Sequence, residues 1–213
     1  MIHFLGTSFA PQHLKTAAIK RGVPVTNGIE EASLVFVSED APVAKDGSRD
    51  LSKIRDLIEI ARSTGAPIVL TSQVPPGFTR SLDIERIWHQ AETLRIKDAT
   101  LRAMNPDYIA VGGESNIPRE YADYLIAFGC PVLRMSWEDA EMSKIAVNMM
   151  LAAQVDYTNM MSEACRKAGA DWKQVSKALH LDQRIGPEAY LTPGRWQDSL
   201  HLLRDWHTLQ GLK

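Results

Sequence analysis

The stretch from Trp137 to Ala168 constrains the fold most, because it contains neither proline nor glycine and Gly169 supplies a stop. Its apolar residues recur at helical spacing: Met142, Ile145, Met149, Ala152, Ala153, Met160 and Ala164. The pattern predicts one α-helix of about 30 residues, roughly 45 Å long. Such a helix extends beyond the flank of one small domain, so we expect it to pack against its own copy in a homodimer through residues 137–168.

The part of the chain before this helix alternates short apolar runs with helical patterns. Strands are predicted at residues 2–5, 23–26, 34–37, 67–71, 108–111 and 131–134, and helices at 11–21, 50–64, 78–86, 96–104 and 118–128. Two shorter helices are predicted after the long one, at 171–180 and 198–209. Strands separated by helices favour a mostly parallel sheet with helices on both faces. The predicted fold class is therefore α/β, with a sheet domain at 1–135 and a helical dimerisation domain at 136–213.

Composition excludes several classes of function. The formal net charge is −2 and no run of Lys or Arg stands out, which disfavours nucleic acid and anionic membranes as partners. No apolar run reaches the roughly 18 residues of a membrane helix, and the first residues lack the features of a signal peptide, so we expect a cytoplasmic protein. Cys130, Cys165 and the histidines form no metal-ligand spacing, so neither a metal site nor a disulfide framework is expected.

Several segments follow one another in an order that a known enzyme family shares. The most specific is Ala140–Ala152 (AEMSKIAVNMMLA), which is similar to a family helix with the pattern AELxKYxxNxxLA. The other segments are Asp40–Ser52, Val69–Gly77, Ala91–Ala99, Asn105–Gly113, Gly169–Asp171, Asp182–Gly186 and Leu191–Gly194. Together they resemble the UDP-glucose/GDP-mannose (nucleotide-sugar) dehydrogenases over about residues 30–205.

The resemblance implies that the sheet domain is a Rossmann-like dinucleotide-binding domain with NAD as cofactor. The family's GxGxxG loop is reduced here to Gly6–Pro11 (GTSFAP), which keeps one glycine of three. Between Val25 and Gly28 there is no room for the usual strand–helix–strand–helix stretch, and the acidic residue that holds the ribose has no obvious counterpart. The cofactor-binding residues that the resemblance implies are Gly6, Ser8, Pro42 and Ser72. We therefore expect weak NAD binding, and Ser72 could instead cap a turn.

The chemistry that the resemblance implies is reduced as well. Family members oxidise a sugar primary alcohol to a carboxylate in two hydride transfers to NAD, and a cysteine traps the intermediate aldehyde. The segment that aligns with the cysteine motif is Asp198–Asp205 (DSLHLLRD), which places His201 at the cysteine position. Neither Cys130 nor Cys165 is a substitute. Without the thiol the thioester route is closed, so we expect at most a two-electron alcohol/carbonyl step.

The resemblance also implies a set of site residues. The catalytic ones are Lys144, Asn148, Glu92, His201 and Asp205, and the substrate-binding ones are Arg184, Leu191 and Gly194. Lys144 and Asn148 are four residues apart and project from one helix face, where a lysine can stabilise a developing alkoxide. The imidazole of His201 would act as a general base near neutral pH. Structural alternatives are a solvated lysine, a structural asparagine, a surface carboxylate at Glu92 and a packing histidine.

Two other interpretations of the sequence stay open beside the oxidoreductase. One is a non-catalytic dimeric scaffold or ligand-binding relative, which the reduced glycine loop favours. The other is a subunit whose nucleotide-binding half is completed by a separate chain. Retention of Lys144, Asn148 and Asp205 favours chemistry on a nucleotide sugar or sugar-like substrate.

Overall fold

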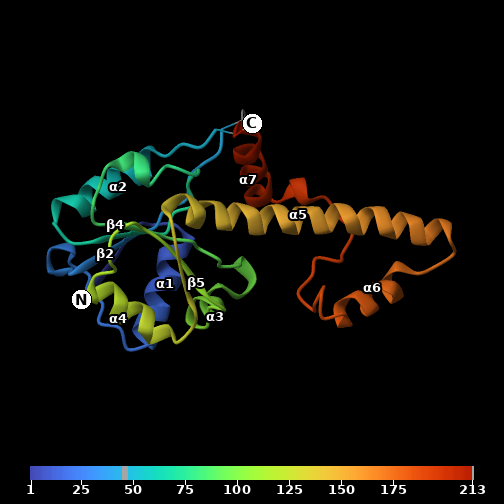
Figure 1. Cartoon of the computed structure of the whole chain (residues 1–213), viewed down its shortest axis with the longest axis horizontal. Helices are drawn as coiled ribbons and strands as arrows, with labels where there is room; N and C mark the ends of the chain where they lie inside the picture. Colours follow the sequence, from blue (N-terminus) through green and yellow to red (C-terminus); the bar gives the residue numbers. More distant parts are fainter. Residues whose placement is uncertain (45–47, 213) are drawn as a thin grey trace. The chain divides into compact units, whose positions relative to one another are not determined.

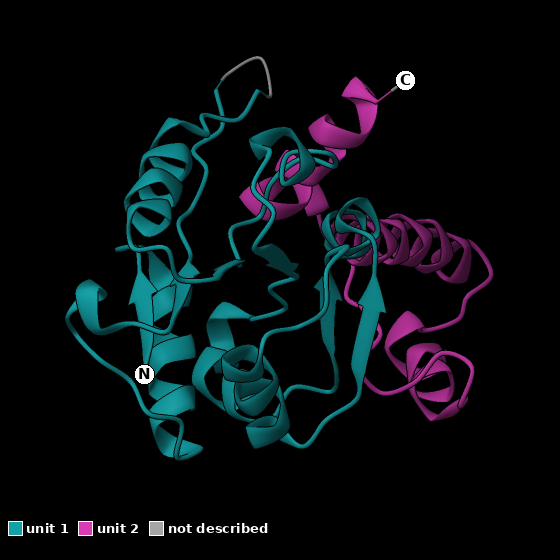
Figure 2. Cartoon of the chain, turned by 60° about the vertical axis from the view of Figure 1, so that its left-hand side comes forward, with its two compact units in different colours: residues 1–144 teal, residues 145–213 magenta. Residues whose placement is uncertain are grey.

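The computed structural model describes residues 1–44 and 48–212. The chain divides into two compact units, Met1–Lys144 and Ile145–Lys213, which are coloured separately in Figure 2. The boundary lies inside the longest helix, α5 (Trp137–Lys167), whose observed ends match the predicted helix to within one residue. Because α5 belongs partly to each unit, the domain boundary expected at residues 135–136 stays a prediction.

Unit 1 is built on a sheet that has six strands among the described residues (Figure 1). The strands are β1 (Ile2–Leu5), β2 (Leu34–Val37), β3 (Ile68–Leu70), β4 (Ile87–Gln90), β5 (Ile109–Gly112) and β6 (Val132–Met135). They lie side by side in chain order, and all neighbours are parallel except β4 and β5, which are antiparallel. The predicted α/β class with a mostly parallel sheet is confirmed.

Both faces of the sheet are covered by helices. The helices of unit 1 before α5 are α1 (Phe9–Lys20), α2 (Ser52–Ser63), α3 (Ala99–Met104) and α4 (Arg119–Phe128). All four side chains of β2 are fully buried, and successive side chains of a strand point to opposite faces. Leu34 and Phe36 belong to a core cluster with α1, α3 and α4. Val35 and Val37 belong to a second cluster with α2 and with Trp137 at the start of α5. The helices α1 and α2 therefore cover opposite faces.

The chain reverses its direction across the sheet at β1. After α1, Val25 forms an isolated parallel bridge with Ile2. The Ile2 N–H donates to the Pro24 carbonyl, and the Ile2 carbonyl accepts the Thr26 N–H. The chain then crosses to the other edge of β1, where the Ser33 N–H donates to the Met1 carbonyl (2.9 Å), and enters β2. The strand predicted at 23–26 is thus reduced to one bridge. Open α/β sheets bind ligands outside the carboxyl ends of the two strands at such a reversal, and we refer to this position beside β1 and β2 as the crevice.

Unit 2 contains the rest of α5 together with α6 (Trp172–Leu181) and α7 (Leu200–Gly211). Its small core groups Cys165, Trp172 and Leu191, and the Trp172 Nε1–H donates to the Leu191 carbonyl (3.0 Å). The buried Cys165 is thus a small core residue with a free thiol. Within the part of the chain that the structure describes, no helix is long and apolar enough to cross a membrane.

The helix predicted at residues 78–86 is wrong. A short 3-10 turn, Arg80–Leu82, forms there, and Asp83 then adopts a left-handed conformation with φ of +53° that ends the turn. The chain next enters β4, a strand that the sequence pattern did not indicate. Trp137 of the second core cluster fixes the start of this strand, because the Trp137 Nε1–H donates to the Ile87 carbonyl (3.1 Å).

Candidate functional site

The loops that follow β1 and β2 approach each other closely at the crevice of unit 1. Gly6 has φ of +134°, and a Cβ at this position would lie 1.8 Å from the carbonyl oxygen of Ser38. A side chain is therefore excluded both by the backbone conformation and by the neighbouring chain. The single glycine that survives from the family's glycine-rich loop is the one that this close approach requires.

A carboxylate lies at this crevice, just before the first turn of α1. Glu39, which follows β2, is 6% exposed, and its Oε2 accepts the Thr7 N–H (2.8 Å) and the Thr7 hydroxyl (3.1 Å). The same oxygen pairs with Lys53 Nζ of α2 (3.0 Å), and this ammonium also donates to Thr7 Oγ1 (2.9 Å). Burial raises the pKa of the Glu39 carboxyl, but the hydrogen bonds from Thr7 and Lys53 outweigh burial and hold the pKa below its ordinary value. The crevice therefore holds an ionised carboxylate.

The other residues expected to bind the cofactor lie around this carboxylate. Ser72 Oγ accepts the Glu39 N–H (2.8 Å), so the serine already fixes the loop after β2. Ser8 is the N-cap residue of α1, and its buried Oγ makes no hydrogen bond with any described residue. Pro42 is exposed, and its carbonyl accepts the Asp50 N–H (2.9 Å). Their roles in cofactor binding stay predictions.

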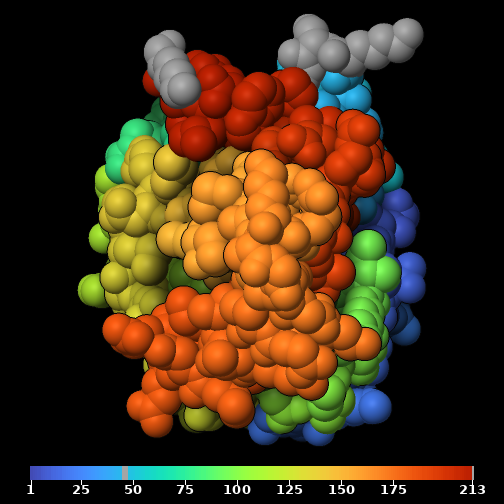
Figure 3. Space-filling model, turned by 90° about the vertical axis from the view of Figure 1, so that its right-hand side faces the viewer, coloured from blue at the N-terminus to red at the C-terminus, as the bar shows by residue number. Residues whose placement is uncertain are grey.

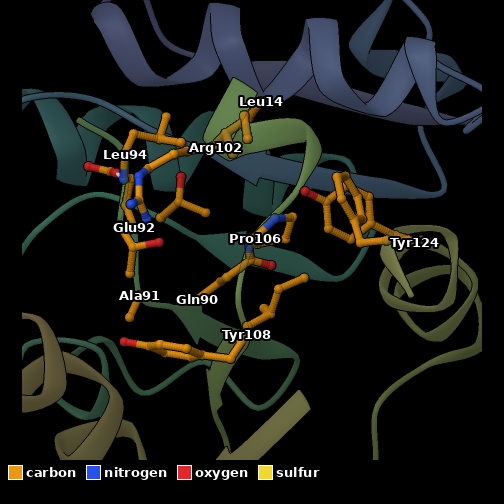
Figure 4. Close-up of a pocket in the computed structure, with 14 residues that line it drawn as sticks. Leu14, Gln90, Ala91, Glu92, Leu94, Arg102, Pro106, Tyr108 and Tyr124 are labelled. Atoms are coloured by element: carbon orange, nitrogen blue, oxygen red, sulfur yellow. Dashed lines mark hydrogen bonds between the residues drawn. The ribbon is translucent and has the colours of Figure 1, made fainter. Parts of the chain in front are cut away.

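Glu92 lies in a different part of unit 1, beside a small cavity after β4. Figure 4 shows its side chain among Leu94, Arg102 and Tyr108, and the carboxylate accepts the Leu94 N–H. The cavity has a volume of about 30 Å³, enough for one or two water molecules, whereas pockets for small organic ligands are roughly ten times larger. In this conformation the cavity is too small for a sugar.

Asn148 and Asp205 come together inside unit 2. Asp205 is fully buried on α7, and its Oδ2 accepts the Asn148 Nδ2–H of α5 (2.6 Å). Its other oxygen, Oδ1, accepts the Arg204 Nε–H (3.4 Å). The family-like segment on α5 and the segment on α7 that aligns with the cysteine motif are thus joined by a buried amide–carboxylate hydrogen bond. His201 is exposed one helical turn before Asp205.

Lys144 is the last residue of unit 1, and its side chain is half-buried. Among the described residues, no carboxylate forms an ion pair with its ammonium and no hydrogen bond from it is found. Arg80 of the same unit, by contrast, pairs with Glu138 and Glu114 at 2.5 Å each. The Lys144 ammonium is therefore available to an external group.

The residues expected to bind substrate lie on the segment of unit 2 between α6 and α7. Arg184 is exposed and pairs with Asp182 (2.7 Å), whereas Leu191 is buried in the small core of unit 2. Gly194 exchanges two hydrogen bonds with the side chain of Asn159, at 2.8 and 2.9 Å. Each of the three has a local structural partner, and their contact with a substrate stays a prediction.

Sequence reasoning missed a buried carboxylate that organises the start of α5. Glu141 is 1% exposed and accepts the Gly77 N–H (2.6 Å), the Thr79 N–H (2.8 Å) and the Thr79 hydroxyl (2.6 Å). Burial raises the pKa of its carboxyl above the ordinary value, although these hydrogen bonds oppose the shift. Glu141 of the family helix pattern and Gly77, which ends the segment Val69–Gly77, were both visible in the sequence, but their hydrogen bond was not.

No cluster of potential metal ligands occurs among the described residues.

Comparison with known proteins shows what the chain is similar to. Residues 138–209 match the model of the UDP-glucose/GDP-mannose dehydrogenase family, central domain. The chain is 28% identical over 194 residues to a UDP-glucose 6-dehydrogenase of Rickettsia typhi, covering 84% of this chain and 44% of that protein. It is 26% identical over 205 residues to the enzyme of the same name from Pseudomonas aeruginosa, with 84% and 44% covered. The chain thus spans less than half the length of these curated relatives.

Solved structures show the same fold. A UDP-glucose dehydrogenase from Pyrobaculum islandicum superposes with a TM-score of 0.72 at 22% identity, covering 98% of this chain and 67% of that one. A GDP-mannose dehydrogenase from Pseudomonas aeruginosa superposes with a TM-score of 0.65 at 19% identity, with 88% and 49% covered. At these identities the likeness confirms the fold and leaves the reaction to be argued from the residues.

Proposed function

We propose, from the premise that this chain belongs to the UDP-glucose/GDP-mannose dehydrogenase family, that it is an NAD-linked oxidoreductase. The reaction is at most a two-electron alcohol/carbonyl step on a nucleotide sugar or a sugar-like substrate. The observation that carries the proposal is Lys144, whose half-buried ammonium forms no ion pair among the described residues. A cation held in this state can stabilise the alkoxide that develops when an alcohol is oxidised.

The cofactor would bind at the crevice of unit 1. The loop after Gly6 fits an anionic group, because it already holds the carboxylate of Glu39. Thr7, Ser8 and Lys53 would hold the pyrophosphate there, since the N-terminus of a helix favours negative charge. NAD, when bound, supplies the acceptor for a hydride. The choice between NAD and NADP does not follow from these contacts.

The remaining site residues would position the substrate and move a proton. Asn148 is held by Asp205, so the amide of Asn148 has a fixed orientation on α5. The exposed His201 would accept the alcohol proton as a general base. Because His201 aligns with the family's cysteine, no thioester forms and the reaction stops at the carbonyl. Glu92 would contribute only if the cavity beside it opens.

We also propose that the protein is a homodimer through α5. In unit 2 this helix exposes small and apolar residues that recur alternately every four and three positions: Ala146, Met150, Ala153, Tyr157, Met160 and Ala164. Met150 is 63% exposed, Tyr157 45% and Met160 59%. Alternation of four and three is the spacing with which a helix packs along a second helix. The outer surface of unit 2, orange to red in Figure 3, includes α5 and α6.

The experiment that tests the enzyme is calorimetric titration with NAD⁺ and NADH, then with UDP-glucose in the presence of the form that binds. Turnover is then followed by NADH absorbance in wild type and in Lys144→Ala. We expect Lys144→Ala to lower kcat at least about 100-fold, with Lys177→Ala, an exposed lysine of α6, as the matched control. Unchanged turnover in Lys144→Ala would remove the role of this lysine. Absence of binding of both cofactor forms at millimolar concentration would instead favour the non-catalytic relative.

A further inference from the structure

Lys144 has one carboxylate within reach on its own helix. Four residues lie one turn away from it along α5, and one of them is acidic: Ala140, Glu141, Val147 and Asn148. Side chains three residues apart on a helix are neighbours, so a glutamate three residues before a lysine can form a stabilising ion pair with it. Glu141 is 1% exposed and Lys144 is half-buried, so both lie on the covered side of α5. An ion pair between these two residues is therefore the arrangement that the helix alone favours.

This ion pair is not formed, because the turn at residues 77–79 holds Glu141. The Oε2 atom of Glu141 accepts the Gly77 N–H (2.6 Å), and Oε1 accepts both the Thr79 N–H (2.8 Å) and the Thr79 hydroxyl (2.6 Å). All three partners are donors, as an ionised carboxylate requires, and both of its oxygens are engaged. No ion pair of Lys144 is found among the described residues. The turn thus binds the one carboxylate that α5 places beside the lysine.

Burial explains why the turn, rather than the lysine, binds Glu141. Thr79 is 1% exposed, so its N–H and hydroxyl would have no acceptor if the carboxylate left. A buried donor without an acceptor costs more free energy than one hydrogen bond contributes. The Lys144 ammonium lies on a flexible side chain that is only half-buried, so water can solvate it. Loss of the ion pair therefore costs less than loss of the contacts between Glu141 and the turn.

We propose that Thr79 is a positioning residue that keeps the Lys144 ammonium available by holding Glu141 away from it. The consequence for catalysis rests on the proposed function: a lysine whose charge is compensated by Glu141 would stabilise a developing alkoxide less well. The competition for Glu141 itself involves only contacts within unit 1, so it can be tested whether or not a substrate is turned over.

The test measures how fast Lys144 reacts with acetic anhydride in the full chain at one pH, followed by mass spectrometry of its peptides. Thr79→Val keeps the shape of the side chain and removes the hydroxyl donor, and Thr79→Ser, which keeps the hydroxyl, is the matched control. Lys177, an exposed lysine of α6, is the internal reference. We expect Thr79→Val to lower the rate at Lys144 about 10-fold relative to Lys177, the effect of one charge-assisted hydrogen bond, and Thr79→Ser to leave it unchanged.

A double variant separates this role from a loss of packing. Thr79→Val combined with Glu141→Gln removes the charge that would pair with Lys144, so we expect the rate at Lys144 to return to the wild-type value. A double variant as slow as Thr79→Val overturns the proposal. Equal rates in wild type and Thr79→Val, or a Lys144 that is not acetylated in wild type, also overturn it. Circular dichroism checks the fold of each variant, and Thr79→Ala, with the same expected result, replaces a Thr79→Val that does not fold.

Turnover, followed by NADH absorbance, distinguishes this inference from the proposed function. If kcat falls in Thr79→Val and recovers in the double variant with little change in KM, both proposals stand. If the reactivity of Lys144 falls and recovers but kcat does not follow it, the role of Thr79 stands and the catalytic role of Lys144 fails. If kcat falls while the reactivity of Lys144 is unchanged, the positioning role is wrong. Absence of turnover in wild type removes the proposed function, and the reactivity of Lys144 then decides the role of Thr79.

Discussion

His89 offers a prediction about stability that follows from its burial. The side chain, on β4, is 3% exposed, and its Nδ1 makes no hydrogen bond with any described residue. Burial lowers the pKa of His89 to about 3, whereas a histidine in the unfolded chain titrates near 6.5. Between these values the unfolded state binds a proton that the folded state does not. The folded state therefore keeps its full stability above about pH 6.5 and loses it progressively as pH falls toward about 3.

The magnitude follows from the two pKa values. Each pH unit below the unfolded pKa costs about 1.4 kcal/mol, so the loss attributable to His89 between about pH 7.5 and about pH 5 is about 2 kcal/mol. Urea unfolding of wild type at the two pH values, followed by circular dichroism and tryptophan fluorescence, measures the total loss. Other groups contribute to that total, so a comparison with variants that cannot titrate at residue 89 is needed.

His89→Gln and His89→Phe provide that comparison. Each variant changes packing, but the change is the same at both pH values and cancels when the difference in unfolding free energy is taken within one variant. We expect both variants to lose about 2 kcal/mol of the pH dependence seen in wild type. A pH dependence equal to that of wild type in both variants would show that His89 titrates alike in the folded and unfolded states, and the argument from burial would be refuted.

Two further predictions concern α5. Glu141→Ala leaves the buried donors of Gly77 and Thr79 without an acceptor. We therefore expect this substitution to lower the free energy of unfolding, measured by urea titration, by about 3–5 kcal/mol. The control is Glu138→Ala, which removes a partly exposed ion pair, and an equal loss in the two variants would contradict the role of Glu141. Tyr157→Glu places a charge among the exposed apolar residues of α5 that we propose form the dimer interface. We expect sedimentation to show a dimer for wild type and for the control Lys167→Glu, and a monomer for Tyr157→Glu. A dimer in Tyr157→Glu, or a monomeric wild type, would exclude this interface.

The sequence was most informative where local pattern alone determines structure. The absence of proline and glycine between Trp137 and Ala168 predicted α5, and Gly169, with φ of +73°, ends it as expected. The run around Arg80 was misleading because its charged and apolar residues alternate much as they do in a helix. The left-handed conformation of Asp83 that interrupts it depends on the turn geometry around it. The mostly parallel sheet and the coverage of both its faces did follow from the alternation of elements.

The candidate site was less accessible to sequence reasoning because its contacts join distant segments. Asn148 and Asp205 were each identified from family segments, but their mutual hydrogen bond depends on how α7 packs along α5. Glu39 and Lys53 were not identified at all. Neither belongs to a spacing that suggests chemistry, and they meet because β2 and α2 bring their ends to the same crevice. An acidic residue two positions after a fully apolar strand was the one signal that could have pointed to Glu39.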